Sequence, residues 1–150
     1  MLKILHNIRD VDFNQFVCVY QESIDRIGSQ QPIYDDLYDF FQCRGAFLAV
    51  WENEGNYLCC VRGELSGDGI LLSCLETAPE KRRRGYATLM LRSLILELRG
   101  NFSGAIYVHV ANKNKASFAL HSKLGFQPCL DYARLVDGTI SRSYCTMKYD

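Results

Sequence analysis

The sequence predicts a single α/β domain in which one sheet of about seven strands is covered by about four helices. Three observations support this fold class. The chain has 150 residues, which is the length of about one domain. Segments with strand-like and helix-like apolar spacing follow one another in the order β-α-α-β-β-β-α-β-α-β-β. No linker, repeat or low-complexity segment interrupts that order, so residues 1–150 are predicted to form one domain.

The first half of the chain is predicted to contain four strands and two helices. Apolar residues recur at helical spacing from residue 10 to Gly28, and a second helix follows Pro32 through Leu37. Polar turns rich in Gly, Asn and Asp separate the later strands. The predicted strands are residues 2–5, 46–51, 57–65 and 70–77.

The second half is predicted to contain two helices and three strands. A helix is predicted to follow the loop at 79–87 and to run to about Arg99. Its Leu89, Leu91 and Leu94 form part of a face too apolar to be exposed. A second helix is terminated by Gly125. That second helix is predicted at 113–124, after a strand at 105–110. The chain then ends in a predicted hairpin of 132–136 and 140–147 around Asp137-Gly138.

Composition is that of an ordinary soluble globule, with 48% hydrophobic and 23% charged residues. There is no apolar run near the roughly 20 residues that a membrane span needs, and the N-terminus lacks a signal-peptide core. The seven cysteines form no C-x-x-C pair and no metal-like Cys/His spacing. These features predict a cytoplasmic protein with free thiols, no metal and no membrane partner, acting as a monomer or homodimer. A net charge of zero argues against a general nucleic-acid binder.

The charges are unevenly distributed along the chain. Residues 10–39 carry seven carboxylates against the single Arg26, whereas residues 81–84 are all basic. An acidic lobe beside a basic loop would suit a cationic amine that meets an anionic cofactor. The alternative is that the acidic residues are the solvated faces of two helices.

The segment 79–87 reads Pro-Glu-Lys-Arg-Arg-Arg-Gly-Tyr-Ala and joins the strand 70–77 to the following helix. The first N–H groups of such a helix are unpaired and, together with the helix dipole, favour a phosphate group. Gly85 has no Cβ and so allows a ligand to approach the main chain. The spacing matches neither the Walker loop nor the G-x-G-x-x-G fingerprint. We therefore predict a diphosphate-binding loop of another kind.

Two motifs together resemble the GNAT N-acetyltransferase superfamily. Residues 82–87 resemble its acetyl-CoA loop, [QR]-x-x-G-x-[GA]. Residues 114–126 resemble its second signature, N-x-A-x-x-x-L-Y-x-x-x-G-F, with Asn114, Leu120 and Gly125 in register. His121 stands where that signature has tyrosine. The two motifs span about residues 69–127, and the predicted order of elements extends the resemblance to the whole chain.

The resemblance implies a mixed, largely antiparallel twisted sheet and a direct transfer of acetyl from acetyl-CoA to a primary amine. The acceptor would be a small molecule or a peptide, and no metal would take part. The strand before the loop would bind the pantetheine arm and acyl carbonyl through backbone groups. The implied cofactor contacts are Leu75, Glu76, Thr77, Arg82, Arg83, Arg84, Gly85, Tyr86, Ala87, Thr88 and Asn114. For Asn114, a role as helix N-cap fits equally well.

Three residues are candidates for acid–base catalysis. His121 occupies the position of the family's usual general acid, and an imidazolium there could protonate the leaving thiolate. His109, at the end of its strand, is a candidate base; the alternative is a core histidine bonded to backbone. Glu76 would point to the opposite face from Leu71 and Ser73 unless a bulge re-aims it, so it is a further candidate base or substrate contact. A bound water is the remaining alternative.

Two other classes of function are weighed against an enzyme. The missing tyrosine would fit a GNAT-like domain that binds acyl-CoA without turnover. The basic tract 81–84 would fit a module that contacts RNA or an acidic partner, although the neutral net charge argues against it.

Overall fold

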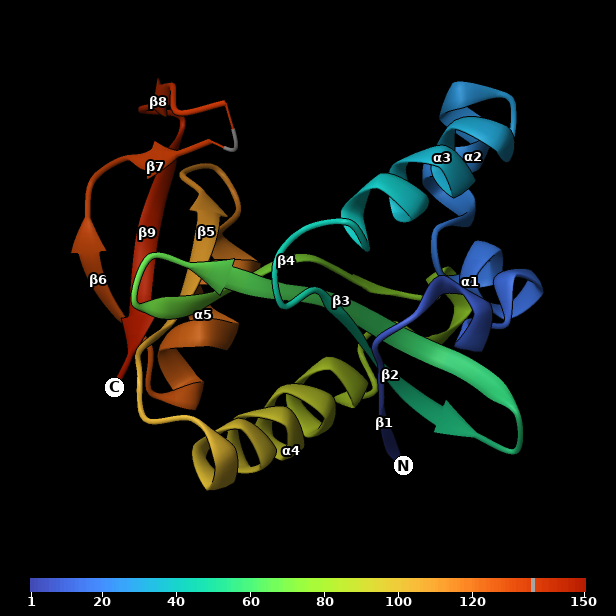
Figure 1. Cartoon of the computed structure of the whole chain (residues 1–150), viewed down its shortest axis with the longest axis horizontal. Coiled ribbons are helices and arrows are strands. Elements are labelled where there is room, and N and C mark those ends of the chain that lie inside the picture. Colours follow the sequence, from blue (N-terminus) through green and yellow to red (C-terminus); the bar gives the residue numbers. More distant parts are fainter. Residues whose placement is uncertain (136) are drawn as a thin grey trace.

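The computed structural model describes residues 1–135 and 137–150, which form one seven-stranded sheet with helices on both faces (Figure 1). The strand order is β1-β2-β3-β4-β5-β9-β6, and β4 and β5 are the parallel pair in an otherwise antiparallel sheet. Its strands are β1 (Leu2–Leu5), β2 (Phe47–Asn53), β3 (Asn56–Ser66), β4 (Gly69–Thr77), β5 (Ile106–Ala111), β6 (Gln127–Leu130) and β9 (Tyr144–Tyr149). The predicted mixed, largely antiparallel α/β fold is confirmed.

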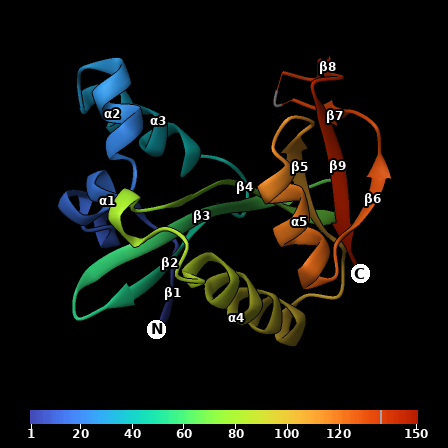
Figure 2. The same ribbon diagram turned by 180° about the vertical axis from the view of Figure 1, so that it is seen from behind.

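The helices are α1 (Phe13–Val19), α2 (Gln21–Ile27), α3 (Gln31–Phe40), α4 (Tyr86–Asn101) and α5 (Lys115–Leu124). Single turns of 3-10 helix lie at Ile8–Asp10 and Pro79–Lys81. In Figures 1 and 2, α4 lies against one face of the sheet, and α2 and α3 lie on the other side. None of the helices described is long and apolar enough to cross a membrane.

Two apolar clusters bury the two faces of the sheet. One contains Met90 and Leu91 of α4, and the other contains Phe16 of α1 and Leu37 of α3. The adjacent residues Cys59 and Cys60 belong to different clusters, as alternation along a strand requires. We call these faces the α4–α5 face and the α1–α3 face. All seven cysteines are free, but only Cys59 and Cys60 are buried.

The helix predicted for residues 10–28 is interrupted. Asp12 caps α1 by accepting a hydrogen bond from the N–H of Gln15, and Tyr20 then leaves helical geometry with φ −99° and ψ 24°. α2 begins at the next residue and ends at Gly28, as predicted. The apolar spacing remains helical through the break, so it could not reveal that the axis changes direction (Figure 1).

α4 buries the face centred on Met90, Leu91 and Leu94, each 0% exposed. Leu89, which was predicted to be buried, is 46% exposed. It lies one residue before the buried stripe and therefore about 100° around the helix from Met90. Burying the leucines of this stripe contributes about 1.5–3 kcal/mol each, so the stripe holds α4 beneath the sheet.

The C-terminal part differs from the predicted hairpin. β6 was not predicted. It contains Pro128, which a strand tolerates here because β6 lies at the edge of the sheet. A short ladder of β7 (Ala133–Arg134) with β8 (Ile140–Ser141) replaces the long hairpin, and β9 starts afresh at Tyr144. Residue 136, the end of the first predicted hairpin strand, lies outside the described residues.

Candidate active site

β4 and β5 lie side by side for three residue pairs and then separate. Their parallel register is Ile70–Ile106, Leu71–Tyr107 and Leu72–Val108. Beyond these pairs, β4 continues beside β3 alone, and β5 continues beside β9. Backbone groups on the facing edges of the two strands are therefore free to bond a ligand that enters between them.

A β-bulge bends β4 just after this separation. The register of β3 with β4 shifts by one residue, so that Cys74 and Leu75 lie opposite a single residue of β3. Cys74 has φ 54°, a left-handed conformation that costs a non-glycine residue about 1–2 kcal/mol. Its carbonyl oxygen accepts a 2.6 Å hydrogen bond from the hydroxyl of Tyr20.

The bulge also decides where Glu76 points. Ser73 pairs with Arg62 and Glu76 pairs with Cys60, and both partners face the α1–α3 side. Glu76 therefore shares a face with Ser73, as the sequence allowed only if a bulge was present. Burial raises the pKa of the Glu76 carboxyl, and the nearby Arg82 guanidinium, 3.4 Å away, opposes that rise.

α4 begins with bare backbone N–H groups. Gly85 is its N-cap residue, with φ 83°, and no side chain caps the helix. The N–H of Leu89 bonds the Gly85 carbonyl at 3.0 Å, so the N–H groups of Tyr86, Ala87 and Thr88 precede the helical ladder. A Cβ placed on Gly85 would meet no atom within 4 Å. This open, positively polarised end of the helix fits a diphosphate.

The three arginines of the loop differ in their surroundings. The Arg82 guanidinium makes bonds of 2.9 and 3.0 Å to the carboxylate of Glu22 in α2, and its Nε donates to the Thr77 carbonyl at 3.2 Å. Arg82 therefore ties α2 to the end of β4. The side chains of Arg83 and Arg84 are exposed, and Arg83 has φ 64°.

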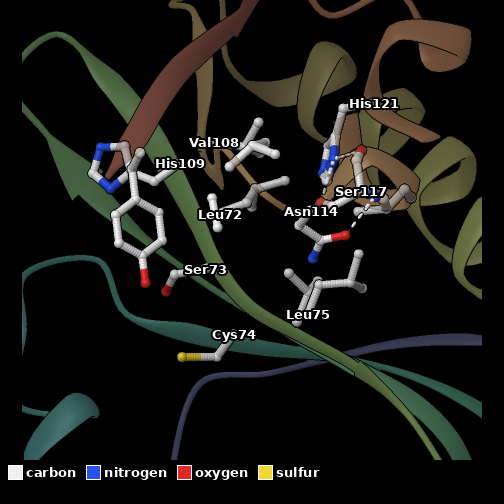
Figure 3. A pocket seen from close by; sticks show the side chains of 14 residues that line it. Leu72, Ser73, Cys74, Leu75, Val108, His109, Asn114, Ser117 and His121 are labelled. Atoms are coloured by element: carbon white, nitrogen blue, oxygen red, sulfur yellow. Dashed lines mark hydrogen bonds between the residues drawn. The ribbon is translucent and has the colours of Figure 1, made fainter. Parts of the chain in front are cut away.

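A cavity of about 280 Å³ occupies the space between the separated strands (Figure 3). We call it the interstrand cavity. Leu75 of β4 lines it, as do Asn114 and Ser117 at the start of α5. The Oδ1 of Asn114 accepts a 3.0 Å bond from the N–H of Ser117, so the residue is the N-cap of α5, and its amide nitrogen points away from Ser117 (Figure 3).

His121 lines the interstrand cavity from α5 and is 4% exposed. Its Nδ1 lies 2.8 Å from the carbonyl oxygen of Ser117. A carbonyl only accepts, so Nδ1 carries the proton and Nε2 of the neutral ring is an acceptor. Burial lowers the pKa of His121, although the bond to Ser117 opposes this effect. The neutral ring is thus favoured at pH 7, whereas the predicted acid role needs an imidazolium.

His109 lies across the sheet from His121, on the other side of Leu72 and Val108 (Figure 3). It is half-buried and shares the α1–α3 face with Tyr107, as alternation along β5 predicted. Burial lowers the pKa of His109, which keeps its imidazole neutral and able to accept a proton at pH 7. The pairing of β5 with β9 places Tyr144 opposite Ala111, and Tyr144 also lines the interstrand cavity.

A second cavity, of about 390 Å³, lies on the α1–α3 face between α3 and the β7 segment. We call it the acceptor cavity. It shares Ser73, Cys74 and His109 with the interstrand cavity. Arg62 forms part of its wall: it is 8% exposed, lies 5.0 Å from the ring centroid of Phe40 and makes a 2.8 Å ion pair with Asp36. Asp39 and Glu64 also line this cavity, as does Arg134.

The structure thus gathers most of the predicted residues around one gap, but in three groups. Leu75, Asn114, His109 and His121 line the interstrand cavity; the loop residues surround the start of α4; Glu76 and Thr77 are engaged with Arg82. The other residues of the site carry no sequence pattern that would have predicted them. They are Tyr20, Arg62, Ser73, Cys74 and Tyr144.

A family model for FR47-like proteins matches residues 57–135, which is more than half of the chain. The matched range runs from β3 to β7 and contains β4, the loop, α4 and α5. A comparison of the sequence with curated proteins gives no match.

Solved structures of similar fold include an N-acetyltransferase from Staphylococcus aureus Mu50, 18% identical, with a TM-score of 0.69 over 100% of this chain and 98% of that one. The PaiA N-acetyltransferase of Thermoplasma acidophilum, solved with coenzyme A, is 12% identical, with a TM-score of 0.68 over 100% and 99%. Another T. acidophilum structure is 24% identical over 55% of this chain and 32% of that one, with a TM-score of 0.51. This chain therefore spans about a third of that protein's length. At identities this low, the structural similarity establishes a shared fold and no more.

The family match covers the loop and the whole of the second signature, and the separated strands beside the uncapped α4 lie within it. The full-length structural neighbours independently show the same architecture. The chain belongs to the FR47-like family of GNAT-type N-acetyltransferases.

Proposed function

We propose that the protein transfers the acetyl group of acetyl-CoA to a primary amine of a small molecule or peptide, by direct attack of the amine on the thioester. One observation carries the proposal: β4 leaves β5 beside the uncapped N-terminus of α4, with the interstrand cavity between them. Family membership supplies the general reaction; the acceptor, the acyl group and the residue roles are the parts proposed.

The diphosphate of the cofactor is proposed to bind the first N–H groups of α4 over Gly85. Exposed Arg83 and Arg84 would add positive charge around it. The pantetheine arm would follow the open edge of β4 at Leu75 into the interstrand cavity, toward the amide of Asn114. Each of these positions offers an unpaired donor or open space to the cofactor.

His109 is proposed as the general base. An amine attacks a thioester only as the free base, so an acceptor that arrives protonated must lose a proton. His109 borders both cavities, and its lowered pKa leaves it neutral at pH 7. Glu76 is the alternative base; its carboxylate is held by Arg82 and is not among the described residues that line either cavity.

The leaving thiolate requires a proton, and two cavity residues could supply it. His121 holds the position of the family's tyrosine, but its Nδ1–H is directed at the Ser117 carbonyl. Tyr144 also lines the interstrand cavity; it is exposed, and its pairing with Ala111 puts its side chain on the same face of the sheet as His109. We favour Tyr144 because a hydroxyl donates in its neutral state, whereas His121 would first have to become protonated.

The acceptor is proposed to lie in the acceptor cavity. Asp39 and Glu64 line it, and neither is part of a salt bridge among the described residues. Arg134 also lines the cavity, so two carboxylates stand against this one arginine, and the balance of charge favours a cationic amine over an anionic molecule. Phe40, Leu71 and Leu135 give the same cavity apolar walls for the rest of the acceptor.

Calorimetric titration with acetyl-CoA tests the cofactor site. We expect micromolar binding by the wild type and loss of binding in Gly85→Glu, since the new carboxylate would stand where the diphosphate is proposed to lie. Gly67→Glu is the matched control: Gly67 has φ +59° and open surroundings, and it precedes β4 rather than following it. The control should bind acetyl-CoA as the wild type does.

A panel of amines, assayed for release of CoA thiol, tests turnover. Thiol release that depends on an amine supports the transferase. Binding without release by any amine would instead indicate a non-catalytic acyl-CoA-binding domain. If the wild type does not bind acetyl-CoA, the cofactor assignment is wrong, and the tract 81–84 should be tested for salt-sensitive binding to RNA.

A further inference from the structure

The peptide group between Cys74 and Leu75 is held from outside the sheet. Its carbonyl oxygen, on Cys74, accepts a 2.6 Å bond from the hydroxyl of Tyr20, which lies 54 residues away in the sequence. In a regular strand, a carbonyl that lies between strands bonds the neighbouring strand. Here the bulge frees the carbonyl, and a side chain from the junction of α1 and α2 takes the place of the strand.

The direction of that carbonyl fixes the direction of the next N–H. The described residues contain no cis peptide bond, and in a planar trans peptide the C=O and N–H point in opposite directions. Tyr20 belongs to the cluster on the α1–α3 face, so the N–H of Leu75 is turned away from that face. The side chain of Leu75 packs against the opposite cluster and lines the interstrand cavity.

We propose that Tyr20 is a positioning residue for acyl transfer: its hydroxyl fixes the Cys74–Leu75 peptide so that the Leu75 N–H is held toward the thioester carbonyl oxygen. The inference rests on the proposed acetyl transfer. As the amine attacks, negative charge develops on that oxygen, and a donor already in place stabilises it without reorganisation. The bond to Tyr20 also polarises the peptide, which makes its N–H a stronger donor. Tyr20 itself touches no reacting atom.

The surroundings of Tyr20 suit this task. The residue is 8% exposed, and its ring lies 4.5 Å from that of Phe16 between centroids. Burial raises the pKa of Tyr20 well above its ordinary value, so the hydroxyl keeps its proton. Two residues later, Glu22 holds Arg82, whose Nε bonds the Thr77 carbonyl. The α1–α2 junction therefore fixes β4 at the bulge and again at its end.

A Tyr20→Phe variant removes only the hydroxyl, and Tyr57→Phe is its matched control. Tyr57 is 5% exposed and packs in the same cluster, but its hydroxyl accepts from the N–H of Asp12, at 3.0 Å, rather than bonding β4. Both variants lose one buried hydroxyl bond and should lose similar stability in denaturant titrations. We expect Tyr20→Phe to lower kcat about tenfold, a fraction of the 10²–10³ seen when such a donor is removed outright. The Kd for acetyl-CoA and the KM for the amine should stay within about twofold, and Tyr57→Phe should keep its kcat.

A second readout does not need turnover. Acetyl-CoA labelled with carbon-13 at the thioester carbonyl reports the hydrogen bond through its chemical shift when bound. The wild type should move the carbonyl resonance downfield, and Tyr20→Phe should return it part of the way toward the free value. Only the folded, cofactor-bound fraction gives this signal, so partial unfolding of the variant would not obscure it.

The outcomes separate the two proposals. Equal kcat in Tyr20→Phe and Tyr57→Phe, or an unchanged bound carbonyl shift in Tyr20→Phe, would overturn the role of Tyr20 while leaving the transferase intact. Binding and a Tyr20-dependent shift without turnover of any amine would overturn the transferase and support the peptide-positioning role. A wild type that does not bind acetyl-CoA would overturn both.

Discussion

The two sides of the gap between β4 and β5 are built in different ways. The cofactor side comes mainly from one stretch, residues 75–88, joined by Asn114 at the start of α5, and it offers mainly backbone N–H groups at the start of α4. The acceptor side is made of residues from α3, β3, β4, β5 and β7, most of which are far apart in the sequence. A site made of backbone can be specified by a short local pattern, whereas a site made of side chains exists only once the sheet has assembled.

An exposed contact ties the cofactor loop to α2, which lies beside α3 on the α1–α3 side of the sheet (Figure 1). Arg82 belongs to the cofactor loop, and Glu22 belongs to α2, 60 residues earlier. Both are partly exposed, at 37% and 63% of the side chain, so water weakens their attraction. Variants on each side, and at the link, should therefore separate cofactor binding from acceptor turnover.

The largest effect is expected at the centre of the comparison, His109. His109→Gln removes the proposed base where the two cavities meet, and positioned bases contribute about 10²–10⁴-fold. We expect kcat to fall by about 100-fold or more, with the Kd for acetyl-CoA nearly unchanged. Steady-state kinetics with a reactive amine, beside calorimetry, would measure both quantities. His6→Gln, the same change at an exposed histidine of the chain, is the control.

The role of His109 as a base also predicts how kcat/KM depends on pH. Burial lowers the pKa of His109, so the base stays neutral at pH 7 and becomes protonated only below the usual value of about 6.5. The wild type kcat/KM should be flat near neutrality and fall as the pH drops through that lowered pKa. His109→Gln should lose this acidic limb. A variant with a normal rate and an unaltered limb would show that another group, such as Glu76 or a water, is the base.

The contrast between the two sides explains what sequence could predict. The order of elements from β2 to α5, the end of α2 at Gly28 and the start of α4 after Gly85 follow from local spacing and turn chemistry. The loop could be predicted because a glycine just before a helix leaves the first N–H groups open to a phosphate, and α4 does begin uncapped after Gly85. Asn114 and Gly125 likewise cap α5 as their residue types suggest.

The rest of the site depends on contacts between distant segments. Tyr20 falls within an unbroken helical pattern, and nothing in that pattern indicates that its hydroxyl reaches β4. Arg62 sits inside an apolar strand, and its ion pair with Asp36 forms only when α3 packs on β3. Tyr144 reaches the interstrand cavity because β9 inserts beside β5, a pairing that local spacing does not encode.

The next largest effect concerns the proton for the leaving thiolate. We expect Tyr144→Phe to lower kcat about tenfold, because it removes a neutral donor from the interstrand cavity. His121→Gln should lower kcat less than about threefold, because its Nδ1–H is already bonded to Ser117 and its neutral state is favoured. The kcat values of both variants at pH 7 decide whether Tyr144 or His121 protonates the thiolate. A larger loss in His121→Gln would assign the acid role to His121, as the sequence predicted.

A smaller effect is expected at the link between the two sides. Glu22→Gln breaks the pair with Arg82, and an exposed pair contributes at most about 1 kcal/mol, or fivefold. The amine KM should rise about two- to fivefold as α2 loosens, while Arg82 becomes free to approach the diphosphate and acetyl-CoA binds at least as tightly. Asp131→Asn breaks the exposed pair with Arg142 and serves as the control. Weaker acetyl-CoA binding with an unchanged amine KM would place Glu22 on the cofactor side.

The smallest effect concerns strain at the bulge. Cys74 and Glu54 both have left-handed backbone, with φ 54° and 51°, but only Cys74 borders the two cavities. Glycine adopts this conformation freely, so Cys74→Gly and Glu54→Gly should each raise the free energy of unfolding by up to about 1 kcal/mol. If the strain at Cys74 helps to present the Leu75 N–H, Cys74→Gly should lower kcat about two- to threefold despite its added stability, because glycine lets that peptide rotate. Glu54→Gly should gain stability without losing rate. Denaturant titration would measure the free energy of unfolding, and steady-state kinetics on the same preparations would measure kcat. Equal kcat values in the two variants would mean that the bulge is shaped by Tyr20 and β3 alone.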